Sequence, residues 1–323
     1  KYRSEEELEK DKKTDPLLVF RKKCIEKSII SEKEFSKIHE KMKNMIEDEV
    51  GYVEQQENPD PDTAFDHLFS DSDELDKISS IEPERTKDKI VMVDSINHAL
   101  SEELEFNKKM IIYGEDVAGD KGGVFTATRG LTKEHGEDRV FNSPLAESSI
   151  IGTAIGLSVV GYKPVVEIQF GDYIWPAMMQ IRNEVATMRY RSGGNWSCPL
   201  VIRVPVGGYI HGSLYHSQSI DGYFAHTPGL KVAYPSNASD AKGLLKYACR
   251  CDDPVLFMEH KGIYRQGFAS SMEPDENYLL PFGKARIVQE GSDLTIVTWG
   301  AIVQKAVEAS RNTGKSVEII DIR

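Results

Sequence analysis

The chain has 323 residues, an apolar share of 40% and a formal net charge of −12 at pH 7. This length is enough for two or more domains, and the acidic balance disfavours nucleic acid as a partner. No segment approaches the ~20 apolar residues of a membrane span, and the four cysteines indicate a reducing compartment rather than a disulfide scaffold. Because the chain begins with Lys1 and ends in an apolar run, we expect it to be a piece of a longer polypeptide.

The first 57 residues are highly charged and are predicted to be helical. Thr14-Asp15-Pro16 is typical of an N-cap followed by proline in the first turn of a helix. Ser31 and Glu34 form a capping box, which predicts a helix that runs towards Gln56.

Residues 58–89 contain prolines, many acids and few apolar anchors, so they are predicted to be a linker wrapped over a surface. Residues 44–76 carry twelve Asp and Glu side chains and no Lys or Arg. Such a run usually marks a solvated or extended segment.

From Ile90 onwards, short apolar runs alternate with segments of helical period. This pattern predicts a mostly parallel sheet with helices on both faces, in which ligands bind beyond the carboxyl ends of the strands. The expected strands are 109–114, 139–142, 163–170, 199–208, 229–236 and 254–260, and the expected helices are 95–107, 152–161, 172–192 and 237–251.

A further unit begins near Leu280 with the pattern strand, strand, helix, strand. It is predicted to be the start of a second α/β domain. Its last run, residues 317–322, is an apolar strand that we expect to lie at a sheet edge without a partner.

Glu147 is the only charged residue between Arg139 and Lys163, and it begins a helix that contains Gly152 and Gly156. One interpretation is a simple acid at a helix N-terminus, stabilised by the helix dipole. The other is a buried acid that holds a proton for a ligand nitrogen, since burial raises the pKa of a carboxyl group. The two glycines cost helix propensity, which favours close approach of something to this helix.

Two further segments suit an active-site edge. Tyr173 follows a predicted strand, and its ring is either a core residue or a face on which a planar ring stacks. Residues 207–229 form a glycine-rich loop with three histidines, among which His211 and His216 lack the helical spacing of a zinc pair. The pair Cys249-x-Cys251 is interpreted as buried free thiols rather than as a metal site.

The chain resembles the beta subunit of the thiamine-diphosphate-dependent 2-oxoacid dehydrogenases over residues 90–323. Within that family the branched-chain 2-oxoacid members are the nearest match, on "RSGG", "LYHSQS", "QFGDYI" and "HKGIYR". The start of the chain resembles the C-terminal tail of the family's alpha subunit, so the two subunits look fused. The main motifs are "YGEDVAGDKGGVFTATRGL", "DRVFNSPLAESSIIGTAIGLSVVG", "VEIQFGDYIWPAMMQIRNEVA", "FAHTPGLKV" and "EGSDLTIVTWG".

The resemblance implies three contacts with the pyrimidine ring of thiamine diphosphate. The carboxylate of Glu147 bonds a ring nitrogen and drives the tautomer that activates the cofactor. The side chain of Tyr173 packs on the ring, and the backbone of Leu145 contacts it. These roles give the lone acid of the apolar run an explanation.

Other residues are assigned on the same resemblance. His216 is expected to donate a proton during acyl transfer to a lipoyl group. Gln169 is expected on the substrate side and Glu115 in a proton path between paired sites. A potassium site, held largely by backbone carbonyls, falls on Leu200, Ala248, Cys251 and Asp253, where Cys251 and Asp253 depart from the family pattern.

The expected architecture is therefore an α/β protein of three parts. Residues 1–89 form an alpha-subunit-like helical tail and acidic linker, residues 90–279 a transketolase-type pyrimidine-binding domain, and residues 280–323 the beginning of a transketolase C-terminal-type domain. The family's Gly-Asp-Gly…Asn magnesium motif is absent from these residues, so Mg²⁺ ligands are expected in an alpha-type half that lies upstream.

The implied function is oxidative decarboxylation of branched-chain 2-oxo acids with acyl transfer to a lipoyl-bearing transacylase core. The alternatives are a pyruvate or acetoin dehydrogenase and a non-catalytic subunit that docks on the core. We expect a cytoplasmic bacterial protein, assembled as a homodimer of fused chains or an alpha2beta2-like complex.

Overall fold

The computed structural model describes residues 3–71, 75, 77 and 85–323, and the chain divides into two compact units between Ala64 and Phe65. Among the described residues, no helix is long and apolar enough to cross a membrane. The other residues of the predicted linker, 72–74, 76 and 78–84, lie outside the described part.

The first unit is built of helices whose starts follow the predicted caps. The Asp15 carboxylate accepts a hydrogen bond of 2.8 Å from the Leu17 amide, and Ser31 and Glu34 form the capping box. None of the residues in these three helices is buried. The helices are α1 (Glu5–Lys13), α2 (Pro16–Glu26) and α3 (Glu32–Glu54), followed by the 3-10 helix η1 (Pro61–Phe65).

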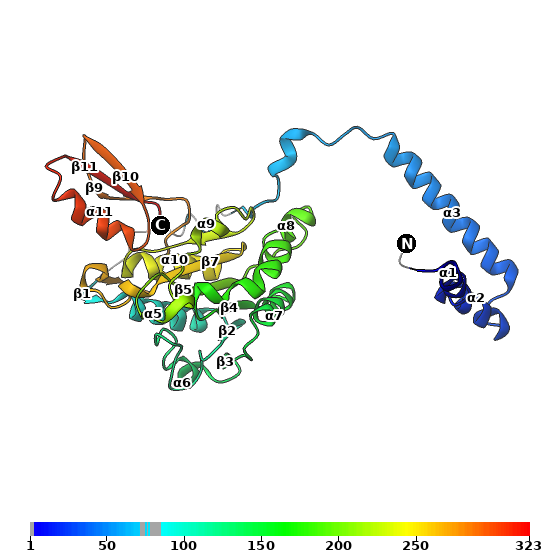
Figure 1. The fold of residues 1–323 in the computed structure, drawn as a ribbon, viewed down its shortest axis with the longest axis horizontal. Coiled ribbons are helices and arrows are strands. Elements are labelled where there is room, and N and C mark those ends of the chain that lie inside the picture. The colour runs from blue at the N-terminus through cyan, green and yellow to red at the C-terminus, as the bar shows by residue number, and fades with distance from the viewer. Residues whose placement is uncertain (1–2, 72–74, 76, 78–84) are drawn as a thin grey trace. The chain divides into compact units, whose positions relative to one another are not determined.

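The second unit contains the predicted parallel sheet. All neighbouring strands of this six-stranded sheet are parallel, because each is followed by a crossover of helix or long loop (Figure 1). In sheet order the strands are β3 (Val140–Asn142), β2 (Met110–Gly114), β4 (Lys163–Glu167), β5 (Val201–Val206), β7 (Val255–His260) and β6 (Lys231–Ala233). The predicted α/β fold class is confirmed.

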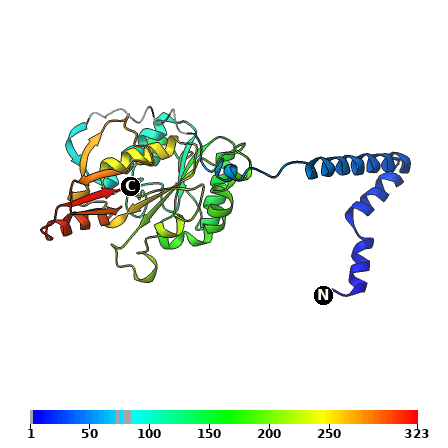
Figure 2. The same cartoon turned by 90° about the horizontal axis from the view of Figure 1, so that it is seen from above.

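Helices lie on either side of the sheet (Figure 2). Alternate strand residues serve two hydrophobic cores, one on each face of the sheet. Met110 and Ile112 face the core that includes α5 (Met92–Phe106) and α10 (Ala238–Arg250). Ile111 and Tyr113 face the core that includes α7 (Glu147–Val159) and the helical segments after β4. Burial on both faces explains why these strands read as nearly continuous apolar runs.

The helix predicted over 172–192 is not one helix. Pro176 lacks an amide hydrogen and disfavours helical geometry in the residue before it, and the Thr187 hydroxyl donates to the Asn183 carbonyl at 2.5 Å, in competition with the backbone. The segment consists of η2 (Gly171–Tyr173), η3 (Trp175–Ala177), the π-helical stretch η4 (Gln180–Val185) and α8 (Met188–Arg191).

One pair of strands escaped the sequence analysis. β1 (Arg85–Ile90) pairs antiparallel with β8 (Ser271–Pro274), although residues 85–89 were assigned to the linker. The run "RTKDKI" has no apolar alternation, so only its tertiary partner reveals it. The remaining short helices are α6 (Leu131–His135), η5 (Ser213–Tyr215), α9 (Asp221–Phe224), η6 (Lys261–Ile263) and η7 (Gly267–Ala269).

The last part of the chain forms a separate three-stranded sheet with one helix (Figure 1). Its elements are β9 (Arg286–Gln289), β10 (Leu294–Thr298), α11 (Ile302–Ser310) and β11 (Val317–Asp321). The prediction that β11 is an unpaired edge was wrong. β11 is the central strand, parallel to β10 and antiparallel to β9, because β9 folds back onto it.

Candidate active site

The predicted site residues gather at one edge of the parallel sheet. Because neighbouring parallel strands end at the same edge, residues that follow them come together there. Four adjacent strands contribute: Glu115 follows β2, Leu145 and Glu147 follow β3, Gln169 and Tyr173 follow β4, and His216 lies in the loop after β5. This edge is the candidate active site.

Glu147 is the first residue of α7, as predicted, but it is only partly buried. Of the two interpretations of Glu147, the acid at a helix N-terminus describes its position, and its carboxylate is less buried than the other interpretation supposes. Leu145, two residues earlier, is 82% exposed. An acid at a helix N-terminus with an open approach is able to meet a ligand directly.

Glu115 is the buried neighbour of Glu147. Its side chain is 3% exposed, and its Oε1 has no hydrogen-bond partner among the described residues. Burial, and then the negative charges of Glu147 and Asp116, raise the pKa of Glu115. Glu115 is therefore protonated more readily than an ordinary glutamate, at a point of the site next to Glu147.

Gln169 lies beside the same acids. Its amide nitrogen donates to the Glu115 carbonyl at 3.4 Å and to Asp116 Oδ2 at 3.2 Å. These two hydrogen bonds hold the Gln169 side chain beside Glu115 and Asp116 rather than in solvent.

Tyr173 and His216 are joined by a hydrogen bond. His216 Nδ1 lies 2.5 Å from the Gly212 carbonyl, and because a carbonyl only accepts, Nδ1 carries the proton. In the neutral imidazole, Nε2 therefore accepts from the Tyr173 hydroxyl, at 2.9 Å. Proton donation from Nε2 thus requires the doubly protonated ring.

Phe170 packs edge-on against both of these rings, with centroid separations of 5.2 Å to Tyr173 and 4.7 Å to His216. Tyr173 itself is only partly buried. One side of its ring is therefore packed and a part of it is accessible, which suits stacking better than a purely core role.

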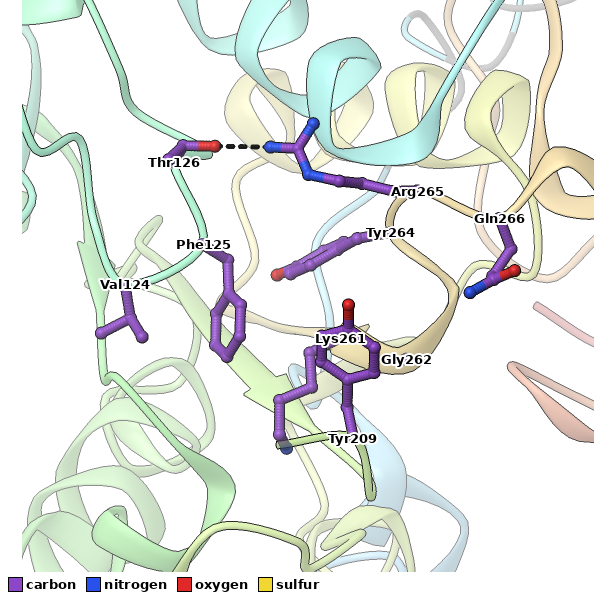
Figure 3. A pocket seen from close by; sticks show the side chains of 9 residues that line it. All are labelled: Val124, Phe125, Thr126, Tyr209, Lys261, Gly262, Tyr264, Arg265 and Gln266. Atoms are coloured by element: carbon purple, nitrogen blue, oxygen red, sulfur yellow. Dashed lines mark hydrogen bonds between the residues drawn. The ribbon is translucent and has the colours of Figure 1, made fainter. Parts of the chain in front are cut away.

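A pocket of about 200 Å³ lies near this aromatic cluster and is lined from three separate segments (Figure 3). Arg265 spans it and donates to the Thr126 hydroxyl at 2.7 Å. Lys261 is buried among the lining residues, and burial lowers the pKa of its ammonium group to about 8. The lining residues are Val124, Phe125, Thr126, Tyr209, Lys261, Gly262, Tyr264, Arg265 and Gln266.

Beneath the site lies a fully buried ionic cluster. The Arg203 guanidinium of β5 donates twice to Glu259, at 2.7 and 2.8 Å, and once to Glu167, at 2.7 Å. The Tyr264 hydroxyl donates to Glu259 at 2.5 Å. Two carboxylates share one cation here, and burial raises the pKa of Glu167 to about 7.

Two of the residues predicted to bind potassium, Cys251 and Asp253, are bonded to lysine side chains. The Lys163 ammonium, buried at the start of β4, donates to the Cys251 carbonyl at 2.8 Å. The Asp253 carboxylate bonds Ser70 and forms an ion pair with Lys231 at 2.7 Å. The Cys251 carbonyl is thus already engaged by a cation of the chain, and the potassium site stays a prediction. Leu200 and Ala248 are both buried nearby in the fold.

Among the described residues, no group of three or more His, Cys, Asp or Glu side chains is placed to hold a metal ion. The cysteines are free, and Cys198, Cys249 and Cys251 are buried.

The sequence analysis did not single out Asp172 and Lys261 as individual residues. Both are at least nine-tenths buried, although both are charged. The available signal was position, because Asp172 follows β4 and Lys261 follows β7 at the edge where ligands bind.

Comparisons with known proteins give matches along most of the chain. The family "Dehydrogenase E1 component" matches residues 1–62, "Transketolase, pyrimidine binding domain" residues 88–266, and "Transketolase, C-terminal domain" residues 283–323. The "2-oxoisovalerate dehydrogenase subunit beta" of Bacillus subtilis (strain 168) is 49% identical over 234 residues, which cover 72% of this chain and 71% of that protein. The chain belongs to the thiamine-diphosphate-dependent 2-oxoacid dehydrogenase E1 family. The resemblance is confirmed at the level of the family.

This E1 chain is similar to relatives of more than one name. "Pyruvate dehydrogenase E1 component subunit beta" of Bacillus subtilis (strain 168) is 46% identical over 237 residues, or 72% of each chain, and that of Staphylococcus aureus (strain Mu50 / ATCC 700699) is 46% identical over the same lengths. A solved structure, "Split gene transketolase, inactive beta4 tetramer", has a TM-score of 0.56 at 24% identity and covers 72% of this chain and 71% of that chain. This likeness supports the fold.

The residues of this E1 chain fit the pyrimidine end of thiamine diphosphate. Glu147 offers a partly exposed carboxylate at a helix start, Tyr173 a partly accessible ring, and Glu115 a buried carboxyl oxygen without a partner among the described groups. A planar, nitrogen-rich ring needs an acid at its edge and an apolar face beneath it.

Proposed function

We propose that this chain is the pyrimidine-holding half of a branched-chain 2-oxoacid dehydrogenase, which decarboxylates its substrate and transfers the acyl group to a lipoyl arm. The observation that carries the proposal is the hydrogen-bonded unit of Tyr173 and His216, set at the same sheet edge as Glu147. A subunit that only docks on a core has no need for this arrangement, because docking uses no proton donor.

Each residue has one task in this proposal. Glu147 holds a proton at the pyrimidine ring nitrogen, and Glu115 keeps that proton available, since burial and charge raise its pKa. Tyr173 supports the ring, and His216 delivers a proton at a later stage from Nε2. When bound, thiamine diphosphate supplies the electron sink that accepts the electrons released with carbon dioxide.

The preference for branched-chain substrates rests on "RSGG", "LYHSQS", "QFGDYI" and "HKGIYR". The identities of 49% and 46% to the two named classes differ too little to decide the substrate. Pyruvate is therefore the second candidate. Rates measured on a panel of 2-oxo acids with the assembled enzyme separate the two, and kcat/KM highest for pyruvate would exclude the branched-chain proposal.

The partners belong to the proposal as well. We expect an alpha-type half that supplies the Mg²⁺ ligands and a lipoyl-bearing transacylase core, in the cytoplasm of a bacterium. The match of residues 1–62 to the E1 component family supports a fused arrangement.

Glu147→Gln tests the central residue. The amide keeps the shape of the side chain but cannot hold the proton, so we expect cofactor binding within about threefold of the wild type and decarboxylation reduced by about a hundredfold or more, the usual range for loss of a general acid. Cofactor binding by fluorescence titration and decarboxylation with an artificial electron acceptor measure both. Near-normal turnover would remove Glu147 from the mechanism.

A further inference from the structure

The segment Gly207–Gln218, which carries His216, follows β5, and the chain then passes through α9 before it re-enters the sheet at β6. Most of its residues are exposed, and His211 and Ser213 have positive φ angles of 54° and 67°. Left-handed conformations are unfavourable for residues other than glycine, so such a loop keeps its shape only when its surroundings hold it.

Hydrogen bonds hold both ends of this loop together. The Gly207 amide donates to the Gln218 carbonyl at 3.0 Å, which closes the loop at its base. The Lys261 ammonium donates to the Gly207 carbonyl, and the Gln218 amide donates to Asp172 Oδ2 at 3.1 Å. A buried cation thus holds one end of the loop and a buried carboxylate holds the other.

We propose that Lys261 and Asp172 act as a pair of positioning residues that clamp the ends of the loop Gly207–Gln218 and so hold His216 against Tyr173. Figure 3 shows the Lys261 side chain turned away from Arg265, with its terminal nitrogen close to the segment that leads to Tyr209. Its charge is directed at the loop rather than at the pocket. The inference rests on the proposed function only in that His216 acts in the reaction.

Each of the two clamp residues is linked to His216 through a neighbouring aromatic side chain. Asp172 and Tyr173 belong to the same turn, η2, so the residue that holds Gln218 is next to the residue that bonds His216. The Lys261 nitrogen lies 5.6 Å from the centroid of Phe170, whose ring packs against His216. A shift of either clamp residue is therefore transmitted to the imidazole.

Stability alone does not explain this pair. Lys261 is 2% exposed and Asp172 8% exposed, and Oδ1 of Asp172 has no hydrogen-bond partner among the described residues. Burial lowers the pKa of Lys261, so its charged form is less favourable here than in water, and the charge of Asp172 offsets only part of that cost. Because buried charges are costly, an apolar residue would serve a purely structural purpose as well or better.

The test is amide hydrogen exchange in the full chain for Lys261→Met, Asp172→Asn and Lys261→Arg. We expect exchange of the Gly207 and Gln218 amides to rise by about tenfold or more in the first two variants, a factor that corresponds to ~1.4 kcal/mol. Lys261→Arg keeps the cation and should restore much of the protection. The amides of β5 should remain protected in all three.

Lys163→Met is the matched control, because Lys163 is also buried and also donates to a single backbone carbonyl, that of Cys251. It should leave the loop amides as they are. Unchanged loop exchange in both Lys261→Met and Asp172→Asn would overturn the clamp. Faster exchange throughout the sheet would overturn it too, since the pair would then stabilise the core rather than position the loop.

Activity in the assembled enzyme provides the second measurement. If the clamp positions His216, Lys261→Met lowers acyl transfer to a lipoyl domain by a larger factor than it lowers decarboxylation with an artificial electron acceptor, and Lys261→Arg recovers part of the loss. Equal loss in both reactions, with the loop amides protected, would contradict the clamp. A failure of the proposed function is recognised separately, because His216→Ala would then spare acyl transfer while the exchange results still stand.

Discussion

In the hydrogen bond between Tyr173 and His216, the hydroxyl donates and the imidazole accepts. Substitution of the two residues is therefore expected to affect acyl transfer to different degrees. His216→Ala removes the proton donor, so decarboxylation with an artificial acceptor should persist, while acyl transfer to a lipoyl domain should fall by about a hundredfold or more. Tyr173→Phe keeps the ring and loses only the hydroxyl, so it should lower acyl transfer less. Equal losses in both assays for His216→Ala would mean that the imidazole shapes the site instead of moving a proton.

Glu167 predicts a pH dependence of stability. Burial raises the pKa of Glu167 from the ordinary 4.5 to about 7. The positive charge of Arg203 opposes this rise, and the negative charge of Glu259 adds to it. Because the folded chain binds this proton more tightly, the contribution to stability is complete below pH 4.5 and is lost as the pH rises to about 7.

Glu167→Gln cannot lose a proton, so its Tm should fall less than that of the wild type between about pH 5 and pH 7.5. Thermal unfolding followed by circular dichroism measures the difference. Glu290→Gln changes an exposed acid and is the control, which should follow the wild type. A variant curve parallel to that of the wild type would show that Glu167 is already ionised across this range.

At the scale of single elements, α7 offers a prediction on helix propensity. A Cβ atom at Gly152 or Gly156 would meet nothing within 4 Å among the described residues. Gly152→Ala should therefore stabilise the isolated chain by up to about 1 kcal/mol, the usual difference between the two residues in a helix. Urea unfolding provides the measurement.

Gly229→Ala is the contrasting variant, because its Cβ would lie 1.9 Å from the Ala186 carbonyl oxygen and its φ angle is +88°. It should destabilise the chain clearly. A lower urea midpoint for Gly152→Ala would indicate that another surface of the chain covers this face of α7 in solution.

Strands could be predicted from the sequence where burial on both faces requires mostly apolar residues. The strands β2, β4, β5 and β7 are buried on both faces and mostly apolar, and their positions in the sequence were predicted. The strands β1 and β8 were missed because their residues carry no apolar pattern, and β11 was misplaced because its neighbour β9 comes from earlier in the chain.

The helix α10 shows a limit of another kind. Its bounds agree with the prediction, and Lys242 and Lys246 lie one turn apart, as on a solvated face. The structure buries both against α5, where Lys242 forms an ion pair with Glu102 at 2.6 Å and Lys246 one with Glu103 at 3.7 Å. Periodicity identifies a charged face, but it does not reveal which element of opposite charge covers it.

The common location of the predicted site residues followed from the sequence, but their bonds did not. Glu115, Glu147, Gln169, Tyr173 and His216 do lie at one edge of the sheet, because parallel strands end together. The hydrogen bond between Tyr173 and His216 joins residues 43 positions apart, and no spacing rule contains it. The partial exposure of Glu147 likewise depends on what surrounds the start of α7.

At the scale of the whole molecule, we predict that the chain of 323 residues is catalytically silent by itself. It offers residues for the pyrimidine end of the cofactor but contains no Gly-Asp-Gly…Asn motif for a metal-bound diphosphate. Most of the affinity for a diphosphate comes from charge-assisted and metal contacts. Decarboxylation of any 2-oxo acid by this chain, with thiamine diphosphate and Mg²⁺ supplied, would contradict the prediction. Activity that returns when an alpha-type half is added would support it.

The bond that closes the loop between Gly207 and Gln218 has a consequence for how such enzymes diverge. Since the two ends meet, the ten residues between them form a side loop, which the bond of His216 to Tyr173 ties to the site, and changes in residues 208–215 put little strain on β5. Residues 208–215 are therefore expected to be exchangeable as a unit. Exchange of residues 208–215, with His216 kept, should therefore leave the urea midpoint of the chain close to that of the wild type.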